Sequence, residues 1–295
     1  MQVIDLFCGA GGSSLGAKLA GHQVIAAYDR NSTFLKSYRE NHPEVPAYNR
    51  DILELEASDL PEGADILMGS TPCESFSLLN MHGRTCDISL TTHFLKLVDD
   101  YKPKFWVMEN VPQVARYLPA GTSYKMLCAA DYGVPQARKR CMCGNYPEPV
   151  PTHRFGELKS WVSFGKIRDP NKDNLGILSK NAIEGAYRRV WEMGKKGNSF
   201  LVRFVDDNTV LNTVTSSEFH GVRAGSHIVY DRGVLRRLTF LECMRAQSFP
   251  DDYIFCGTIA ERYKQVGQAV PPLMMKAILS GLEGRNILER RDDPD

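Results

Sequence analysis

The chain has 295 residues, 43% hydrophobic and 24% charged, a composition typical of a folded globular protein and unlike disordered, collagen-like or low-complexity chains. This length allows one large α/β domain with a small appendage, because single cores stop growing near roughly 250–300 residues. The 36 Lys and Arg residues nearly balance the 35 Asp and Glu residues, giving a formal net charge of +1. A nucleic-acid surface would therefore have to be a local patch.

The eight cysteines lack the short repeated spacings of a zinc ribbon or a disulfide framework. No basic leader precedes the apolar stretch at residues 3–7, and no apolar run reaches the roughly 18–20 residues that span a bilayer. We therefore expect a soluble, cytoplasmic protein with reduced thiols and with no metal or membrane partner.

Short β-branched runs alternate with helical patterns through the first half of the chain. This alternation favours a mostly parallel sheet covered by helices. The predicted strands are 3–7, 23–28, 64–68 and 104–108, and the predicted helices are 13–20, 32–41 and 88–100. Ligands of such sheets bind beyond the carboxyl ends of the strands, so we expect a site assembled from several loops.

From about residue 147 to residue 235 the pattern loosens into short segments broken by proline and glycine, without helix–strand alternation. Regular periodicity returns at 238–247 and 271–282, which are predicted amphipathic helices. The sequence thus predicts one larger domain, made of 1–146 and 236–295, with a small irregular region at 147–235.

The segment from Asp5 to Gly12 follows the first predicted strand and opens a helix. Its glycines would let the backbone closely approach a bound adenosyl group. Ser14 takes the place of the last glycine of a dinucleotide fingerprint, which disfavours a dehydrogenase. Asp29, at the end of the second strand, is a candidate acceptor for a ribose diol. A packing turn and a helix-capping carboxylate are the respective alternatives.

Cys73 lies on a proline-containing loop after the strand 64–68, where a thiol is placed for nucleophilic attack. Most lone cysteines are small core residues, so this interpretation needs partners. Glu109 ends the next strand and would lie beside Cys73 at the same edge of the sheet. Arg138 and Arg140 occupy alternate positions and point the same way if that segment is extended.

Together these segments resemble the cytosine-C5 DNA methyltransferase family. The hallmarks occur in the expected order: residues 7–12, Pro72-Cys73, Glu109-Asn110-Val111, Gln136-Ala137-Arg138-Lys139-Arg140, residues 237–239 with Glu242-Cys243, and residues 265–267. The match covers the chain except for about residues 147–235. It implies a Rossmann-like class I methyltransferase fold with a mostly parallel seven-stranded sheet, and a small target-recognition region at 147–235.

The resemblance implies methyl transfer from S-adenosylmethionine to C5 of a flipped-out cytosine in double-stranded DNA, by a monomer. Cys73 would add to C6 and Glu109 would bond N3 and the exocyclic amine. Arg138 and Arg140 would hold the ring O2 and the loop that carries the nucleophile. Ser77 and the loop after it would close on the extruded base.

The same resemblance places the cofactor across the first strands and DNA on the irregular region. The implied cofactor contacts are Phe7, Gly9, Gly11, Asp29, Arg30, Asp51, Ile52, Pro72, Leu90, Gln268 and Ala269. The implied nucleic-acid contacts are Ser77, Gln136, Arg188, Arg189, Lys195, Lys196 and Arg203, with Trp191, Phe200 and Phe204 interleaved. A solvated basic face is the alternative for the region 188–203.

Some positions depart from the family pattern. Gln268 replaces the usual asparagine, and Arg30 stands where a bulky apolar residue often covers adenine. The stretch 111–126 leaves little room for the usual helix and strand. These departures fit a compact, divergent enzyme of bacterial or phage origin.

Three alternative functions stay open at this point. A tRNA cytosine methyltransferase would keep every catalytic motif, although the chain lacks the Cys-Phe-Thr tripeptide of that branch. A variant enzyme could transfer a modified methyl group, admitted by Gln268. A catalytically silent DNA-binding relative is disfavoured, because Cys73, Glu109, Arg138 and Arg140 are all present.

Overall fold

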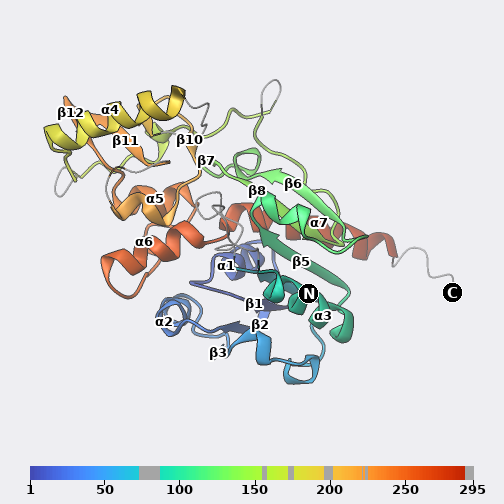
Figure 1. Cartoon of the computed structure of the whole chain (residues 1–295). Coiled ribbons are helices and arrows are strands. Elements are labelled where there is room, and N and C mark those ends of the chain that lie inside the picture. Colours follow the sequence, from blue (N-terminus) through green and yellow to red (C-terminus); the bar gives the residue numbers. More distant parts are fainter. Residues whose placement is uncertain are drawn as a thin grey trace.

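The computed structural model describes residues 1–72, 87–154, 158–171, 176–195, 202–220, 222 and 225–289. A seven-stranded sheet forms its centre (Figure 1). The strands are β1 (Gln2–Leu6), β2 (Gln23–Asp29), β3 (Ala47–Asn49), β4 (Ile66–Ser70), β5 (Phe105–Asn110), β6 (Tyr124–Cys128) and β8 (Lys139–Gly144). Their order is β3-β2-β1-β4-β5-β8-β6, and only β8 runs antiparallel to its neighbours. The predicted mostly parallel seven-stranded sheet is confirmed.

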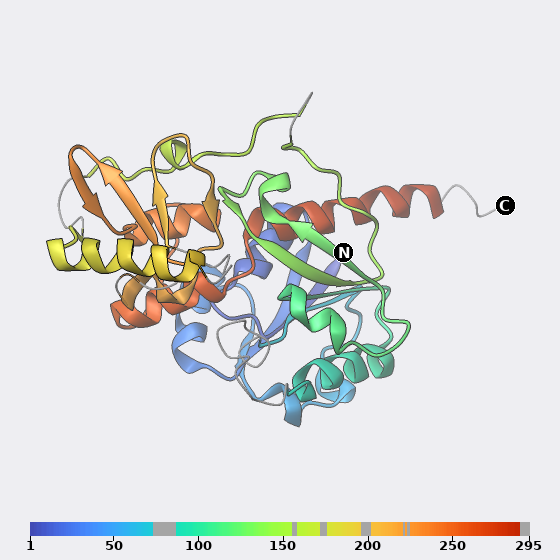
Figure 2. The ribbon, with the colours of Figure 1, turned by 45° about the horizontal axis from the view of Figure 1, so that its top comes forward.

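Helices cover both faces of this sheet (Figures 1 and 2). They are α1 (Gly12–Leu19), α2 (Ser32–Asn41), α3 (Ser89–Tyr101) and α7 (Pro272–Glu289). Side chains of α1, α2 and α7 join one buried cluster, and those of α3 join the cluster on the opposite face. The central strands are therefore apolar almost throughout, as strands covered on two sides must be.

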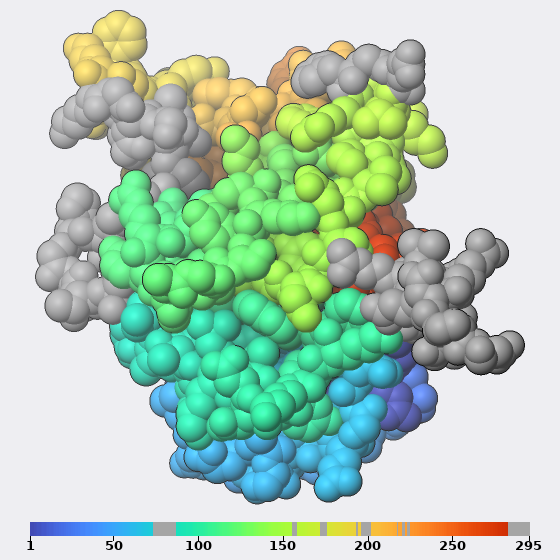
Figure 3. All heavy atoms as spheres, turned by 90° about the vertical axis from the view of Figure 1, so that its right-hand side faces the viewer, coloured from blue at the N-terminus to red at the C-terminus, as the bar shows by residue number. Residues whose placement is uncertain are grey.

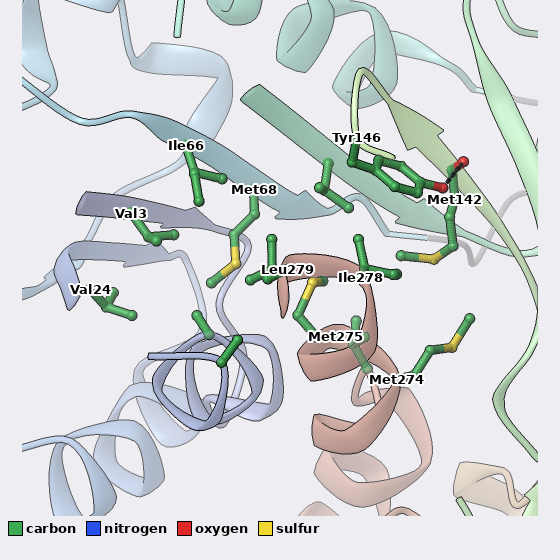
Figure 4. Close-up of a cluster of buried hydrophobic side chains, with 14 of the residues drawn as sticks. Val3, Val24, Ile66, Met68, Met142, Tyr146, Met274, Met275, Ile278 and Leu279 are labelled. Carbon is green, nitrogen blue, oxygen red and sulfur yellow. Dashed lines mark hydrogen bonds between the residues drawn. The ribbon is translucent and has the colours of Figure 1, made fainter. Parts of the chain in front are cut away.

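The helix α7 closes one face of the sheet beside the N-terminal strand. Figure 4 shows Met275 and Leu279 of α7 close to Met68 of β4, and all three side chains are fully buried. The helix predicted at 271–282 is thus present, and it extends further, to Glu289. This packing brings the C-terminal part of the chain next to the glycine-rich segment that follows β1.

The region 147–235 contains more regular structure than the sequence predicted. It holds the 16-residue helix α4 (Lys180–Lys195) and a three-stranded sheet of β9 (Arg203–Val205), β11 (His227–Asp231) and β12 (Val234–Arg236). The prediction of short segments without helix–strand alternation therefore missed α4 and this sheet. The strands have only three to five residues, and two glycines interrupt the α4 sequence.

Residues 111–126, which the sequence leaves with little room for the usual helix and strand, hold a shortened helix and the start of a strand. The short 3₁₀ helix η3 (Pro112–Arg116) follows β5, and β6 begins at Tyr124. The other short 3₁₀ helices are η1 (Ile52–Glu54), η2 (Ala57–Asp59), η4 (Ala129–Tyr132), η5 (Phe164–Lys166) and η6 (Ser216–His220). A short 3₁₀ helix needs fewer residues than an α-helix of usual length, which is how the short stretch 111–126 accommodates one.

The region 147–235 is attached to the sheet through β7, β10 and two helices. The strand β7 (Gln136–Ala137) pairs in parallel with β10 (Leu211–Asn212), and α5 (Phe240–Ala246) and α6 (Ile259–Gln268) follow β12 in the chain. One buried cluster contains Val205, Val214 and Val229 together with Met244 and Val266. The division at residues 147 and 235 stays a prediction, and this shared cluster crosses it.

Figure 3 shows the yellow and orange residues of this region above the green and blue residues of the sheet. No helix within the described ranges is long and apolar enough to cross a membrane. The described residues also contain no group of three or more His, Cys, Asp or Glu side chains that could hold a metal ion.

Candidate active site

Glu109 lies at the carboxyl end of β5 and is held from both neighbouring strands. Nε of Arg140 on β8 lies 2.8 Å from one carboxylate oxygen, and the hydroxyl of Ser70 on β4 donates to the other oxygen at 2.8 Å. The register accounts for this arrangement, because Ser70 lies opposite Glu109, and Met142, two residues from Arg140, lies opposite it on the other side. Glu109 is only 5% exposed, so its carboxylate has a fixed orientation.

Asn110 fixes the end of β4 next to this carboxylate. Its amide donates to the hydroxyl of Thr71 at 2.8 Å and to the carbonyl of Thr71 at 3.2 Å, while its oxygen accepts from the N–H of Val111. Thr71 and Pro72 lead directly to Cys73. Asn110 belongs to the Glu109-Asn110-Val111 motif, and its place next to Glu109 was the only sign in the sequence that it has a function. Its bonds to Thr71 on the neighbouring strand end could not be predicted from residue spacing.

Cys73 and Ser77 lie outside the described residues, and the predictions for both remain predictions. Pro72 and Leu90, which flank that segment, are half-buried. Pro72, the last described residue before Cys73, follows Ser70 by two residues, and Ser70 lies opposite Glu109 in the sheet.

Arg138 and Arg140 bind different partners among the described residues, and their predicted roles at the ring O2 and at the loop that carries the nucleophile stay predictions. Arg138 is 2% exposed. Its guanidinium donates to the carbonyl of Val214 at 3.1 Å, of Gly267 at 3.2 Å and of Ala269 at 3.1 Å. Arg138 therefore ties the recognition region to the end of α6, and only Arg140 contacts Glu109.

Gln136, like Arg138, is buried among distant parts of the chain and is not positioned to contact DNA. Its amide nitrogen donates to the carbonyl of Ala246 at 2.7 Å and to the side-chain oxygen of Gln247 at 2.8 Å. Its oxygen accepts from the N–H of Val214 at 2.9 Å. The side chain is fully buried, so the predicted nucleic-acid contact is corrected to a structural bond.

The glycine-rich segment after β1 has the conformation that a closely bound nucleoside requires. Gly9 and Gly11 have φ angles of 55° and 98°, and Phe7 has a φ of 58°, an uncommon value that costs roughly 1–3 kcal/mol in a residue with a side chain. A Cβ placed on Gly9 would meet only Phe34, at 3.9 Å, so that side of the backbone is open. The loop thus leaves room for a ligand against its backbone.

Asp29 at the end of β2 faces the same loop. Its two carboxylate oxygens accept from the N–H of Gly9 at 2.9 Å and of Asn31 at 2.7 Å. Burial raises the pKa of Asp29, while these two bonds oppose the rise. Each oxygen has a second lone pair that can accept a hydrogen bond from a ribose hydroxyl, so these acceptors fit the ribose of S-adenosylmethionine.

The predicted adenine contacts are only partly available. Arg30 is exposed, and its Nη1 lies 3.8 Å from Oδ2 of Asp51, so the loops after β2 and β3 face each other. Ile52 is 2% exposed within the core cluster that includes α3, and its side chain offers almost no free surface. Gln268 and Ala269 are half-buried at the end of α6.

A cavity of about 460 Å³ lies beside the ends of β2 and β3, but neither Arg30 nor Asp51 lines it. It is lined by Tyr28, Tyr48, Asn49, Arg50, Leu55, Asp59, Leu60 and Pro61. The rings of Tyr28 and Tyr48 stack there at a centroid distance of 5.0 Å. None of the predicted cofactor contacts belongs to this lining.

The predicted basic patch is partly assembled on α4 and β9. Arg188, Arg189, Lys195 and Arg203 are all exposed, and Lys196 lies outside the described residues. Arg189 donates to the carbonyl of Val222 at 2.7 Å, and Arg203 donates to the side-chain oxygen of Asn212 at 3.0 Å.

Exposed aromatic rings lie among these cations. Trp191 is 68% exposed, and Nζ of Lys195 lies 4.9 Å from the centroid of its ring. Tyr187 stacks on Phe204 at 4.9 Å. Because residues 187, 191 and 195 follow at four-residue intervals, they share one face of α4.

Comparison with known proteins decides which enzyme this site belongs to. The family model of the C-5 cytosine-specific DNA methylases matches residues 1–117 and 121–283. The chain belongs to this family. The methylase is 29% identical to the type II methyltransferase M1.HphI of Haemophilus parahaemolyticus, over 98% of this chain and 88% of that protein. It is also 29% identical to M.MthTI of Methanothermobacter thermautotrophicus, over 96% of this chain and 98% of that protein.

Solved structures agree with this assignment at the level of the fold. A mutant of DNMT2 from Spodoptera frugiperda has a TM-score of 0.71 and 18% identity, with 96% of this chain and 99% of that chain covered. A putative DNA modification methyltransferase encoded within an E. coli prophage has a TM-score of 0.68 and 22% identity, with 98% and 99% covered. The family match and the type II relatives show that the methylase transfers a methyl group from S-adenosylmethionine to C5 of cytosine in DNA, as the motifs predicted. Transfer of a modified methyl group, the alternative that rests on Gln268, stays a prediction.

Proposed function

We propose that the methylase acts as a monomer on double-stranded DNA, through a covalent bond between Cys73 and C6 of a flipped-out cytosine. Cytosine C5 is too weak a nucleophile to accept the methyl group unaided. Addition of a thiolate at C6 makes C5 a much stronger nucleophile, because the electrons of the C5–C6 double bond then become available at C5. Bound S-adenosylmethionine supplies the methyl group. A base then removes the C5 proton, the C5–C6 double bond re-forms and the cysteine leaves.

The cluster of Ser70, Glu109 and Arg140 carries this proposal. Thiolate addition places negative charge on the ring at N3 and O2, and side chains held in advance at these atoms stabilise that charge without reorganising. The carboxyl group of Glu109 serves N3 and the exocyclic amine, and the guanidinium of Arg140 serves O2. Their 2.8 Å contact keeps the two groups side by side, as the adjacent ring atoms require.

The residues present fit the cofactor at the ends of β1 and β2. Asp29 receives the ribose hydroxyls, and the loop of Phe7, Gly9 and Gly11 lies against the methionine and ribose portions. Arg30 and Asp51 border the adenine, and Pro72, Leu90, Gln268 and Ala269 form the remaining wall. Arg138 contributes indirectly, since it holds the carbonyl of Ala269.

A base inside a duplex cannot reach this site, so the cytosine leaves the helix and Ser77 with its loop closes behind it. The exposed face of α4, with Arg188, Arg189 and Lys195, contacts the DNA, and Arg203 on β9 extends it. Cations supply phosphate contacts, and the flanking aromatic rings supply apolar contacts to sugars and bases.

The biological setting is also part of this proposal. Both relatives named above are called type II methyltransferases, which supports a role in a bacterial or phage restriction–modification system. Such an enzyme works on DNA in the cytoplasm, where its thiols stay reduced. The six cysteines that the structure describes are free thiols.

The covalent step is tested with duplex DNA that carries 5-fluorocytosine at the target position, whose C5 substituent cannot leave as a proton. Wild-type enzyme with S-adenosylmethionine should form an adduct that survives denaturing electrophoresis. Cys73→Ser should form none while still binding DNA and cofactor, because a serine hydroxyl does not ionise as a thiol does. Cys128→Ser, which alters a half-buried thiol at the end of β6, is the matched control and should form the adduct normally. An adduct in Cys73→Ser would overturn the assignment of the nucleophile.

A further inference from the structure

The chain segment after α5 returns to the N-terminal part of the molecule and is fixed there along α2. The side chain of Asn41 donates to the carbonyl of Ile254 at 2.8 Å and accepts from its N–H at 2.9 Å. The hydroxyl of Ser37 accepts from the N–H of Cys256 at 2.8 Å and donates to Gln265 at 2.5 Å. These bonds span more than 200 residues of sequence and give the segment one defined position.

Tyr253, in this segment, lies directly behind the glycine-rich loop. Its hydroxyl donates to the carbonyl of Ala10 at 2.5 Å. Nε2 of His42, the residue after α2, lies 3.0 Å from the Tyr253 oxygen and 3.2 Å from the carbonyl oxygen of Gly11. Two consecutive carbonyls of the loop are therefore bound from the side that carries these two rings.

The protonation of His42 follows from its other neighbour. Nζ of Lys18 lies 2.6 Å from Nδ1 of His42, and an ammonium group has hydrogens to donate but no lone pair to accept. Nδ1 is therefore the acceptor, and the ring hydrogen sits on Nε2, where it points at Tyr253 and Gly11. Burial first, and the charge of Lys18 second, lower the pKa of His42 to about 4, so the ring stays neutral near pH 7.

Gly11 shows how closely the loop rests on these side chains. A Cβ at this position would lie 2.4 Å from Nε2 of His42 and 2.7 Å from the hydroxyl oxygen of Tyr253. Its φ of 98° independently favours glycine. At the other end of the loop, the N–H of Gly9 donates to Asp29, the proposed ribose acceptor. The loop is thus fixed at Ala10 and Gly11 by Tyr253 and His42, and at Gly9 by Asp29.

We infer that Tyr253 is a positioning residue for S-adenosylmethionine, oriented by His42 and through it by Lys18. Peptide groups whose carbonyls are bound from behind cannot rotate those oxygens toward the ligand, where they would repel a carboxylate. The inference rests on the proposed place of the cofactor at this loop. It concerns cofactor affinity only, because the hydrogen bonds of the three side chains reach the glycine-rich loop and one another, and neither Glu109 nor α4 is among their described partners.

Tyr253→Phe tests the inference, since it removes one hydroxyl and leaves the ring among Phe249 and Phe255. Loss of a hydrogen bond of this kind should raise the KM for S-adenosylmethionine and the Kd for S-adenosylhomocysteine by roughly 3- to 10-fold. The kcat and the KM for DNA should stay within about twofold. His42→Gln should produce the same pattern, and Lys18→Met a weaker one; these two also serve if Tyr253→Phe does not fold.

Tyr146→Phe is the matched control. Tyr146 and Tyr253 are both 7% exposed, and the hydroxyl of Tyr146 also donates to a backbone carbonyl, that of Met142 at 2.8 Å (Figure 4), far from the glycine loop in sequence. It should lower thermal stability without raising the KM for the cofactor. If Tyr253→Phe behaves like Tyr146→Phe, or if it lowers kcat and DNA affinity instead, the positioning role is wrong. If the wild type itself fails to bind S-adenosylhomocysteine, the proposed cofactor site fails as well.

Discussion

The carboxyl edge of the central sheet and the exposed face of α4 use charge in opposite ways. At the sheet edge, Glu109 and Arg140 are nearly buried and touch each other, and Asp5 is buried at the end of β1. On α4, Arg188 and Lys195 are exposed to solvent. Salt screens exposed charges over roughly 8–10 Å but acts much less on buried pairs. The sheet edge should therefore respond to mutation and pH, and the α4 face to ionic strength.

This difference matches the two tasks of the enzyme. Chemistry on a single base needs groups that stay in place in a water-poor site, where electrostatic contacts are strongest. Binding a long polyanion needs cations that exchange with counterions at its surface. The following variants test whether the two regions can be perturbed separately.

Glu109→Gln should have the largest effect on the chemistry. An amide cannot pass a proton to the cytosine ring and cannot form the ion pair with Arg140, so the single-turnover rate should fall by about 10²–10⁴-fold. Cofactor affinity and the salt dependence of DNA binding should hardly change. Glu148→Gln makes the same change at an exposed carboxylate and is the control. An unaltered rate would remove Glu109 from catalysis.

Asp5 should give the folded protein a pH dependence that Asp5→Asn removes. Burial raises the pKa of Asp5 to about 7, although the hydroxyl of Ser14 donates to it at 2.6 Å. Because this pKa lies above its unfolded value, the native state binds more protons between pH 4 and pH 7. Its contribution to stability is complete below pH 4 and is lost as the pH rises through 7, by on the order of 4 kcal/mol.

Denaturant unfolding between pH 5 and pH 8 measures this slope. Asp5→Asn keeps an oxygen that accepts from Ser14 but cannot ionise. Its stability should therefore lack the fall with pH that Asp5 causes in the wild type, so that the variant is the more stable protein at pH 8 and the difference between the two shrinks toward acid pH. Asp100→Asn, at an exposed position of α3, should leave the slope unchanged. Parallel pH curves for wild type and Asp5→Asn would contradict the assignment.

The sequence was sufficient for the catalytic half because local signals there agree with the tertiary structure. The alternation of strands and helices predicted β1, β2, β4, β5 and their helices, and motif order placed Glu109 and Arg140 together. Gln136 was misassigned to DNA, since it sits in the same motif as Arg140, and the carbonyl partners of Arg138 were not foreseen. Whether a side chain turns to the substrate or to carbonyls 76 to 131 residues away depends on segments that no local spacing encodes.

The recognition region was predicted less well for a different reason. The helix α4 has apolar residues at helical spacing, Ile183, Ala186 and Val190, and Ala186 and Val190 join one cluster, so its periodicity was present in the sequence but was overlooked in a region rich in glycine and proline. The strands β9 and β12 are three residues long. Tyr253 and His42 were also missed, because 211 residues separate them and each looks like an ordinary core residue by itself.

Replacing Arg188, Arg189, Lys195 and Arg203 together by Ala should weaken DNA binding without changing the single-turnover rate at saturating DNA. Each phosphate contact that is lost reduces the slope of log K against log salt by about 0.9. Titrations from low to moderate salt measure this slope. Replacing Lys36, Lys96, Lys102 and Lys104, four exposed cations on α2, on α3 and after α3, removes the same charge as a control. If both sets lower the slope equally, the effect comes from net charge and the α4 face is not the DNA contact.

Gln268→Asn should have the smallest effect, and it joins the two regions. Gln268 ends α6 between Gly267 and Ala269, whose carbonyls both bind Arg138, and Arg138 also binds the carbonyl of Val214 in the recognition region. Shortening the side chain by one methylene removes at most one neutral hydrogen bond, worth roughly 0.5–1.5 kcal/mol. The KM for S-adenosylmethionine should shift by less than about tenfold in either direction, with the salt slope unchanged. Mass spectrometry of nucleosides should detect only 5-methylcytosine from both proteins, even when a carboxylated cofactor is also offered, because a longer amide that merely fills space does not select a larger group. A second modified cytosine from the wild type alone would mean that Gln268 binds the transferred group itself.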